Sequence, residues 1–131
     1  MIQSGQLASL IKEHIISPVT YTSNANSLKT ALIRVEALGY VEASVELRQM
    51  WKEAQAREAI LKLIETDGVY RRIIKYMVRG MPTPNIVALT YPDTSKDSIR
   101  YKVSKIDEAI MYFRYEPRSV TLSRIMGANY Q

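Results

Sequence analysis

The stretch SLKTALIRVEALGYV, residues 27–41, decides the fold class. Its apolar residues recur three and four positions apart, which places them on one side of an α-helix. They are Leu28, Ala31, Leu32, Val35 and Leu38. Ser27 or an asparagine just before it can cap the start, and Gly39 stands where a left-handed residue ends a helix. The stretch therefore predicts an amphipathic helix with one buried face.

The same periodicity predicts a helix on each side of this one. A helix capped by Ser4 runs to about residue 16, and Pro18 closes it. A third helix is capped by Ser44 and reaches Asp67-Gly68, which forms either a kink or a short turn. The inward face expected for the third helix consists of Leu47, Met50, Trp51, Ala54, Leu61 and Ile64.

Helical periodicity resumes after Gly68 and ends at Gly80. A last long helix is expected over residues 95–115, and Pro117 begins a short final helix that ends at Gly127. The stripe of the long helix consists of Ile99, Val103, Ile106, Ile110 and Phe113. Residues 81–95 between them are rich in proline and turn signals, and the apolar run 86–91 fits either a strand or a helical turn.

These patterns predict an all-α fold. Stripes on four main helices are buried most simply in an antiparallel helical bundle, with a short terminal helix and one irregular proline-containing segment. A chain of 131 residues with 47% hydrophobic and 24% charged residues fits a single domain spanning residues 1–131. No apolar run reaches the ~18 residues of a membrane span, and the first residues lack the apolar core of a signal peptide.

The sequence offers little material for catalysis, so we expect no enzymatic activity, no cofactor, no metal site and no small-molecule substrate. Cysteine is absent, which excludes thiolate ligands and a cysteine nucleophile. His14 is the one histidine, and on the apolar face of a helix it is expected to be a half-buried packing residue. Glu58 and Glu65 share a helix face, and we expect them to pair with basic residues rather than to form a catalytic pair.

The segment YRRIIKYMVRG, residues 70–80, is the strongest candidate for a binding surface. At about 100° per residue, Arg71, Lys75, Arg79 and Arg72 fall within a single sector of the helix, and Tyr76 lies at its edge. Residues 69–92 contain no acidic side chain. This face is either a solvated surface or a contact for a phosphate backbone, an anionic membrane surface or an acidic protein surface.

Residues 27–41 also resemble the recognition helix of winged-helix DNA-binding domains, which ends in a Leu-Gly-aromatic-Val turn. The alternative to a structural role is therefore an intracellular DNA-binding protein, which is either winged-helix-like or contacts the phosphate backbone through the basic helix of residues 70–80. A wing requires a β-hairpin after the turn, whereas Ser44 begins another helix. Lys29, Arg34 and Glu36 give the helix only a small positive charge.

Tyrosines provide a further indication of function. Tyr101, Tyr112 and Tyr115 lie off the apolar stripe of the long helix, and Tyr130 lies in the tail. Tyrosine and arginine are enriched in protein interfaces because both combine a large contact area with a polar tip. Half of these tyrosines are expected to lie at the edge of the core and the others to serve assembly.

The whole chain resembles the small virion structural proteins of the two-tailed spindle-shaped viruses of the archaeon Acidianus. The resemblance rests on its length, its basic charge, its six methionines, its lack of cysteine, its abundance of isoleucine and tyrosine, and the stripes in residues 28–38 and 99–113. It implies a non-enzymatic helical bundle that is made in the host cytoplasm and builds the virion. The implied partners are copies of itself or other virion proteins, with contact to packaged double-stranded DNA.

Overall fold

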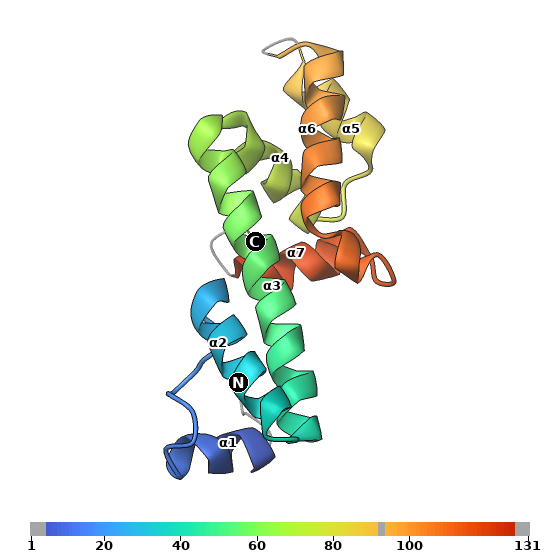
Figure 1. Ribbon diagram of the computed structural model, residues 1–131. Coiled ribbons are helices and arrows are strands. Elements are labelled where there is room, and N and C mark those ends of the chain that lie inside the picture. The colour runs from blue at the N-terminus through green and yellow to red at the C-terminus, as the bar shows by residue number, and fades with distance from the viewer. Residues whose placement is uncertain (1–4, 92–93, 128–131) are drawn as a thin grey trace. The chain divides into compact units, whose positions relative to one another are not determined.

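The computed structural model describes residues 5–91 and 94–127, and in these ranges the fold is all-α with no strand (Figure 1). Seven α-helices and one 3-10 turn follow each other along the described chain. They are α1 Gly5–Lys12, α2 Ala25–Ala37, α3 Val41–Thr66, α4 Val69–Val78, α5 Thr83–Thr90, α6 Lys96–Ala109, η1 Met111–Phe113 and α7 Arg118–Met126. The predicted fold class is confirmed, while Ser4, Pro92, Asp93 and Tyr130 lie outside the described residues.

The internal contacts divide the chain into two compact units, Met1–Glu58 and Ala59–Gln131. Helix α3 contributes residues to both units. The expectations of a single domain over residues 1–131 and of one antiparallel bundle of four main helices stay predictions.

In the first unit, the apolar face of α2 packs against α3 and α1, as the stripe in residues 27–41 predicts (Figure 1). Leu28, Leu32 and Val35 are fully buried and share a core with Leu47 of α3. Leu7 and Leu10 of α1 complete the core. A polar contact also joins α1 to α3, because the backbone N–H of Ala43 donates to Gln6 Oε1 at 2.7 Å.

Helix α2 begins and ends close to where the sequence predicts. The Asn24 side chain accepts a hydrogen bond from the backbone N–H of Ser27 at 2.8 Å, which satisfies one donor of the first turn. Gly39 has φ +80°, as a left-handed helix stop requires. Leu38 is the exception: it is the C-cap rather than part of the buried stripe and is 51% exposed.

Helix α3 differs from its prediction at the start and on its inward face. It begins at Val41, so Ser44 lies inside the first turn, where its hydroxyl donates to the Val41 carbonyl at 2.8 Å instead of capping the helix. Leu47, Met50 and Ala54 are buried as predicted. The expected face also included Leu61, which is 42% exposed, while Ile60 is fully buried.

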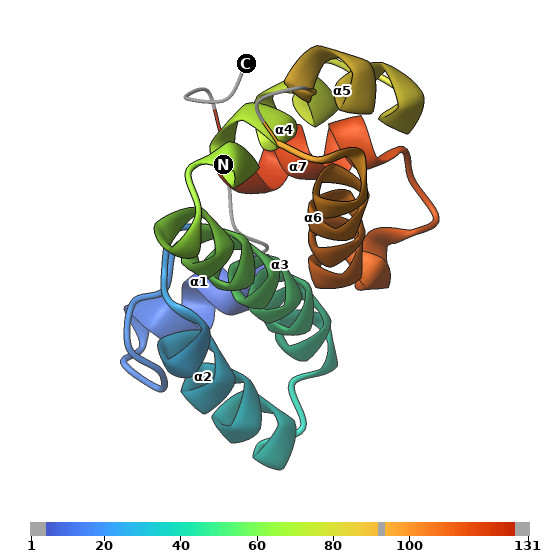
Figure 2. The same cartoon turned by 90° about the horizontal axis from the view of Figure 1, so that it is seen from above.

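In the second unit, α4 packs on α7, α5 and α6, and α5 packs on α6 (Figures 1 and 2). The proline-containing segment that was expected to be irregular contains α5. Pro84 lies in the first turn of α5, where its missing N–H leaves no intrahelical bond unmade. Ile86, Val87 and Thr90 are buried, so the apolar run is part of a helix rather than a strand.

The last long helix is interrupted. Ser95 caps α6 by accepting a hydrogen bond from the N–H of Ser98, but α6 ends at Ala109 and a 3-10 turn follows. The expected stripe nevertheless stays buried along its full length, from Ile99 to Phe113. Helix α7 follows Pro117 and ends at Gly127, as predicted.

The prediction for His14 is wrong. Helix α1 ends at Lys12, and His14 is exposed and has φ +60°. The N–H of Ile15 donates back to the Leu10 carbonyl at 3.0 Å, which is the bond that closes a helix through a left-handed residue. His14 therefore ends the helix instead of packing on its apolar face.

Candidate polyanion-binding face of helix α4

Asp67 positions the start of helix α4. Helix α3 ends at Thr66, and Asp67 Oδ1 accepts a hydrogen bond from the N–H of Val69 at 3.0 Å. The open choice at Asp67-Gly68 is therefore settled as a turn that begins a new helix. Asp67 Oδ2 also lies 3.1 Å from Nζ of Lys102 on α6.

The inner face of α4 is apolar and buried. Tyr70, Ile73, Ile74 and Met77 are at most 5% exposed. Their spacing of three and four residues fixes the rotation of the helix about its axis. The opposite side must then face solvent.

The predicted basic residues occupy that outer side. Arg71, Arg72 and Lys75 are exposed on α4, and Arg79 is exposed as its C-cap residue. Tyr76 is half-buried at the edge, as the helical projection predicts. We call the four cations the α4 basic face. Lys75 and Arg79 lie at the carboxyl end of the helix, where its dipole favours positive charge.

Most of the α4 basic face lacks counter-charges. Among residues 5–91 and 94–127, Arg71, Lys75 and Arg79 take part in no ion pair or side-chain hydrogen bond. Other arginines of the same unit are paired: Arg118 lies 3.2 Å from Asp107 and also donates to Thr83 Oγ1, and Arg124 lies 2.6 Å from Glu116. Arg71, Lys75 and Arg79 are thus available to meet an external anion.

Asp67, close in sequence to this face, does not neutralise it. The hydrogen bond from Val69 and, next, the one from Lys102 hold the pKa of the Asp67 carboxyl below its ordinary value. Both oxygens are therefore committed to the start of α4 and to Lys102, whose side chain is only 12% exposed.

The net charge of the chain resides in the unit that carries this face. Residues 1–58 contain six basic and six acidic side chains, whereas residues 59–131 contain twelve and seven. The formal charge of +5 therefore belongs to the second unit. A uniform field of one sign attracts polyanions over distances of about one Debye length, roughly 8–10 Å at physiological salt.

The described residues lack the wing that a winged-helix domain requires. Helix α3 begins at Val41, directly after the turn at Gly39, and the described residues contain no strand that could form a wing. Lys29 on α2 lies over the Trp51 ring, with Nζ 4.1 Å from its centre, and Arg34 donates to the Ile15 carbonyl. The cations of α2 thus face their own unit rather than forming a free basic surface.

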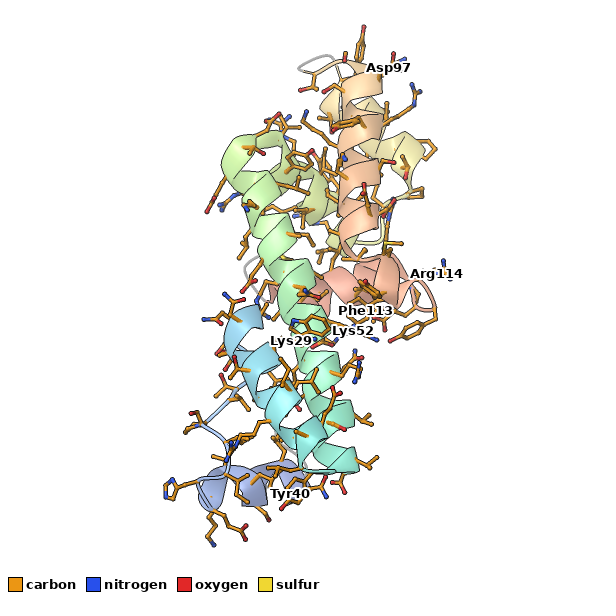
Figure 3. All side chains as sticks on the ribbon, viewed as in Figure 1. Lys29, Tyr40, Lys52, Asp97, Phe113 and Arg114 are labelled. Carbon is orange, nitrogen blue, oxygen red and sulfur yellow. The ribbon has the colours of Figure 1, made fainter. Side chains whose placement is uncertain are left out.

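The tyrosines of the last long helix are exposed. Tyr101, Tyr112 and Tyr115 are 59%, 63% and 74% exposed, while Phe113 between them is buried. Arg114, next to Tyr115, projects outward (Figure 3). This turn therefore presents aromatic and cationic groups together. A further exposed apolar group, Val41 and Val45, lies on α3. A helix start at Ser44 does not predict it, because Val41 then precedes the helix.

The carboxylates considered for catalysis have other roles or none. Glu58 Oε1 accepts a hydrogen bond from the N–H of Ala25 at 3.0 Å, at the start of α2. The expected ion pairs of Glu58 and Glu65 are absent from the part of the chain that the structure describes.

Among the described residues, no three His, Cys, Asp or Glu side chains lie close enough together to bind a metal ion. None of the described helices has the length and apolar character that a membrane span requires.

Comparisons of the chain with models of protein families, with curated proteins and with solved structures find no match.

Proposed function

We propose that this chain is a non-enzymatic structural protein of a virus particle, which self-assembles or joins other virion proteins and contacts double-stranded DNA through the α4 basic face. The observation that carries the proposal is the set of four exposed cations at Arg71, Arg72, Lys75 and Arg79. Their apolar opposite side is buried, so the face is held in place by the core of its unit.

The spacing of the α4 basic face suits a phosphate backbone. Residues three and four apart on a helix have Cβ atoms about 5–6 Å apart, so long basic side chains at these positions can reach neighbouring phosphates of one backbone. Arginine predominates, and its planar fork binds phosphate with two hydrogen bonds. Tyr76 at the edge adds a hydroxyl donor that can reach a phosphate oxygen.

Exposed apolar groups support the assembly part of the proposal. Val41, Val45 and Tyr115 are 65–74% exposed. Such side chains gain free energy when a partner covers them, at roughly 25 cal/mol per Å² of apolar surface. The whole-chain resemblance to archaeal virion structural proteins agrees with this role, and the proposed location is the virion after synthesis in the host cytoplasm.

The contact to DNA is tested by fluorescence anisotropy with a labelled duplex at low salt. Replacing Arg71, Arg72, Lys75 and Arg79 by Gln together should weaken binding by at least about 100-fold, because each phosphate contact contributes substantially at low ionic strength. The control variant carries Lys62, Lys96, Arg100 and Arg114 replaced by Gln, which removes the same number of exposed charges from the same unit.

The control decides between a specific face and general attraction. Under the proposal it retains most of the wild-type affinity. Equal losses in both variants would show that DNA responds only to net charge, and unchanged binding in the first variant would show that the α4 basic face is not used. Flotation with anionic vesicles at the same salt tests whether the face binds a membrane surface instead. Binding to vesicles but not to DNA would assign the face to a membrane surface.

A further inference from the structure

The first unit contains a pocket that the proposed function does not use. Its volume is about 640 Å³, within the range of roughly 300–1,000 Å³ that small-molecule sites occupy. One wall is the loop that follows α1, residues 14–19, and the other is the side of α2 that carries Ser27, Thr30, Ala31 and Arg34.

The loop wall is mostly apolar, with His14 and Ser17 as its polar members, and backbone hydrogen bonds fix it. The N–H groups of Ile15 and Ile16 both donate to the Leu10 carbonyl, at 3.0 and 3.4 Å. Ile16 and Val19 are buried in the core of the unit. The loop therefore presents Ile15 and Pro18 to the pocket from an anchored backbone.

Arg34 is the one arginine or lysine that lines the pocket, and no acidic residue lines it. Its Nε donates to the Ile15 carbonyl, which joins α2 to the loop. The guanidinium has five N–H donors, so four on its terminal nitrogens remain, and the described residues provide no acceptor for them. A fixed guanidinium with a free planar edge is the group that best binds a carboxylate with two parallel hydrogen bonds.

Two of the three hydroxyls that line the pocket, those of Thr30 and Ser27, do not compete for that role, and the third belongs to Ser17 on the loop. Thr30 Oγ1 donates to the Asn26 carbonyl and Ser27 Oγ donates to the Asn24 carbonyl, both at 3.0 Å. Their protons are therefore already used. With one permanent cation and mostly apolar walls, the site suits a single negative charge on an apolar body rather than a phosphate.

We propose that this pocket binds a small aliphatic monocarboxylate, with its carboxylate on the terminal nitrogens of Arg34 and its chain against Ile15, Val19 and Ala31. The inference stands on residues 14–34 and is independent of the α4 basic face. A ligand of this size, such as octanoate, should bind with a Kd of about 1 mM.

The test is a titration of the ¹⁵N-labelled full chain with octanoate, followed by amide chemical shifts. Saturable shifts are expected at residues 15–19 and 30–34. Octanol, which keeps the chain without the charge, and acetate, which keeps the charge without the chain, should each bind at least about tenfold more weakly. Equal binding of octanol, or shifts that do not saturate or that map elsewhere, would overturn the proposal.

Two variants separate recognition from folding. Arg34→Gln removes the guanidinium, and Thr30→Phe leaves Arg34 intact but places a ring at an exposed position that lines the pocket. Each should weaken octanoate binding about tenfold or more. Arg48→Gln, which removes an exposed arginine paired with Glu36 on the same unit, should leave it unchanged. If Thr30→Phe, with a wild-type circular dichroism spectrum, binds octanoate as tightly as the wild type, the pocket is not the site.

Discussion

At the residue scale, the ends of three helices show that the backbone conformation required at a position can outweigh the side-chain role expected from the sequence. Gly39, Gly80 and His14 follow α2, α4 and α1 with positive φ, and in each case the next N–H bonds back to the carbonyl five residues earlier. Glycine meets this demand without strain, whereas a residue with a Cβ atom costs about 1–2 kcal/mol in the left-handed region. His14 is therefore the strained member of the three.

Replacing His14 by Gly should raise the free energy of unfolding by about 0.5–1 kcal/mol, because relief of the left-handed strain exceeds the added entropy of the unfolded chain. Gly39→Ala should lower it by about 1 kcal/mol, and since no atom lies within 4 Å of the added Cβ, that loss comes from φ alone. Urea denaturation measures both. A decrease in stability for His14→Gly would mean that the imidazole makes a favourable contact that outweighs the strain.

Asp67 should make stability depend on pH in the acidic range. Its carboxyl pKa is lowered in the folded state, mainly by the hydrogen bond from Val69 and then by Lys102. A lowered folded pKa means that the stabilisation is present above the unfolded value of about 3.9 and is lost as pH falls through the folded value. Asp67→Asn keeps an oxygen for the Val69 N–H but removes the charge.

The variant should accordingly be less stable than the wild type at pH 7, and the difference should shrink towards zero near pH 2. Urea denaturation at a series of pH values measures it. Glu116, whose pKa is lowered first by the hydrogen bond from Arg124, titrates in both proteins and so cancels from the difference. A difference that does not change between pH 7 and pH 2 would contradict the assigned role of Asp67.

At the element scale, the sequence predicts helices best where periodicity, cap and stop agree. For α2 and α4 an apolar stripe is followed by a glycine, and both helices end within two residues of that glycine. The start of α3 was misplaced because Ser44 satisfies the rule for a cap, while its hydroxyl actually bonds to Val41 inside the helix. For α5 the sequence leaves a strand and a helical turn open, because the prolines around the run are turn signals, although Pro84 lies where a helix tolerates it.

The two candidate sites also differ in how well the sequence predicts them. The α4 basic face could be predicted, because all its residues lie on one helix and a helical projection orders them. The Arg34 pocket could not, because it depends on the path of residues 14–19, and that path follows from the left-handed conformation of His14. Periodicity alone treats Arg34 as an ordinary solvent-exposed residue.

The apolar stripe of α2 predicts that substitutions at two adjacent positions change the free energy of unfolding by very different amounts. Leu32 is fully buried and Ile33 is 58% exposed. Leu32→Ala should lower the free energy of unfolding by about 3 kcal/mol, from lost burial and the cavity left behind. Ile33→Ala should change it by less than about 0.5 kcal/mol. Urea denaturation of the two variants checks this contrast, and similar losses at both positions would mean that α2 is rotated about its axis.

At the scale of the whole molecule, charge and exposed apolar surface are distributed unequally. Residues 1–58 are neutral overall and include Val41 and Val45 on the exposed side of α3, 73% and 65% exposed. Residues 59–131 carry the net charge of +5. The proposed role therefore assigns protein contacts to the exposed valines of the first unit and DNA contacts to the α4 basic face of the second. The tyrosines near Arg114, which also belong to the second unit, provide a further protein contact.

Self-association should respond to the exposed valines. Val41→Ser combined with Val45→Ser should weaken association about tenfold, as expected when two side chains lose apolar contact area. Gln49→Ser combined with Gln55→Ser, at exposed polar positions of the same helix, should have no effect. Sedimentation velocity over a concentration series measures the dissociation constant. A wild-type chain that stays monomeric at millimolar concentration would contradict the assembly role.

The salt dependence of DNA binding tests the central claim most directly. For the wild type, the logarithm of the association constant should fall with the logarithm of salt concentration with a slope of about −3 to −4, as four phosphate contacts require. The variant with Arg71, Arg72, Lys75 and Arg79 replaced by Gln should lose nearly all of that slope. An unchanged slope in this variant, or a wild-type chain that does not bind the duplex at low salt, would contradict the account.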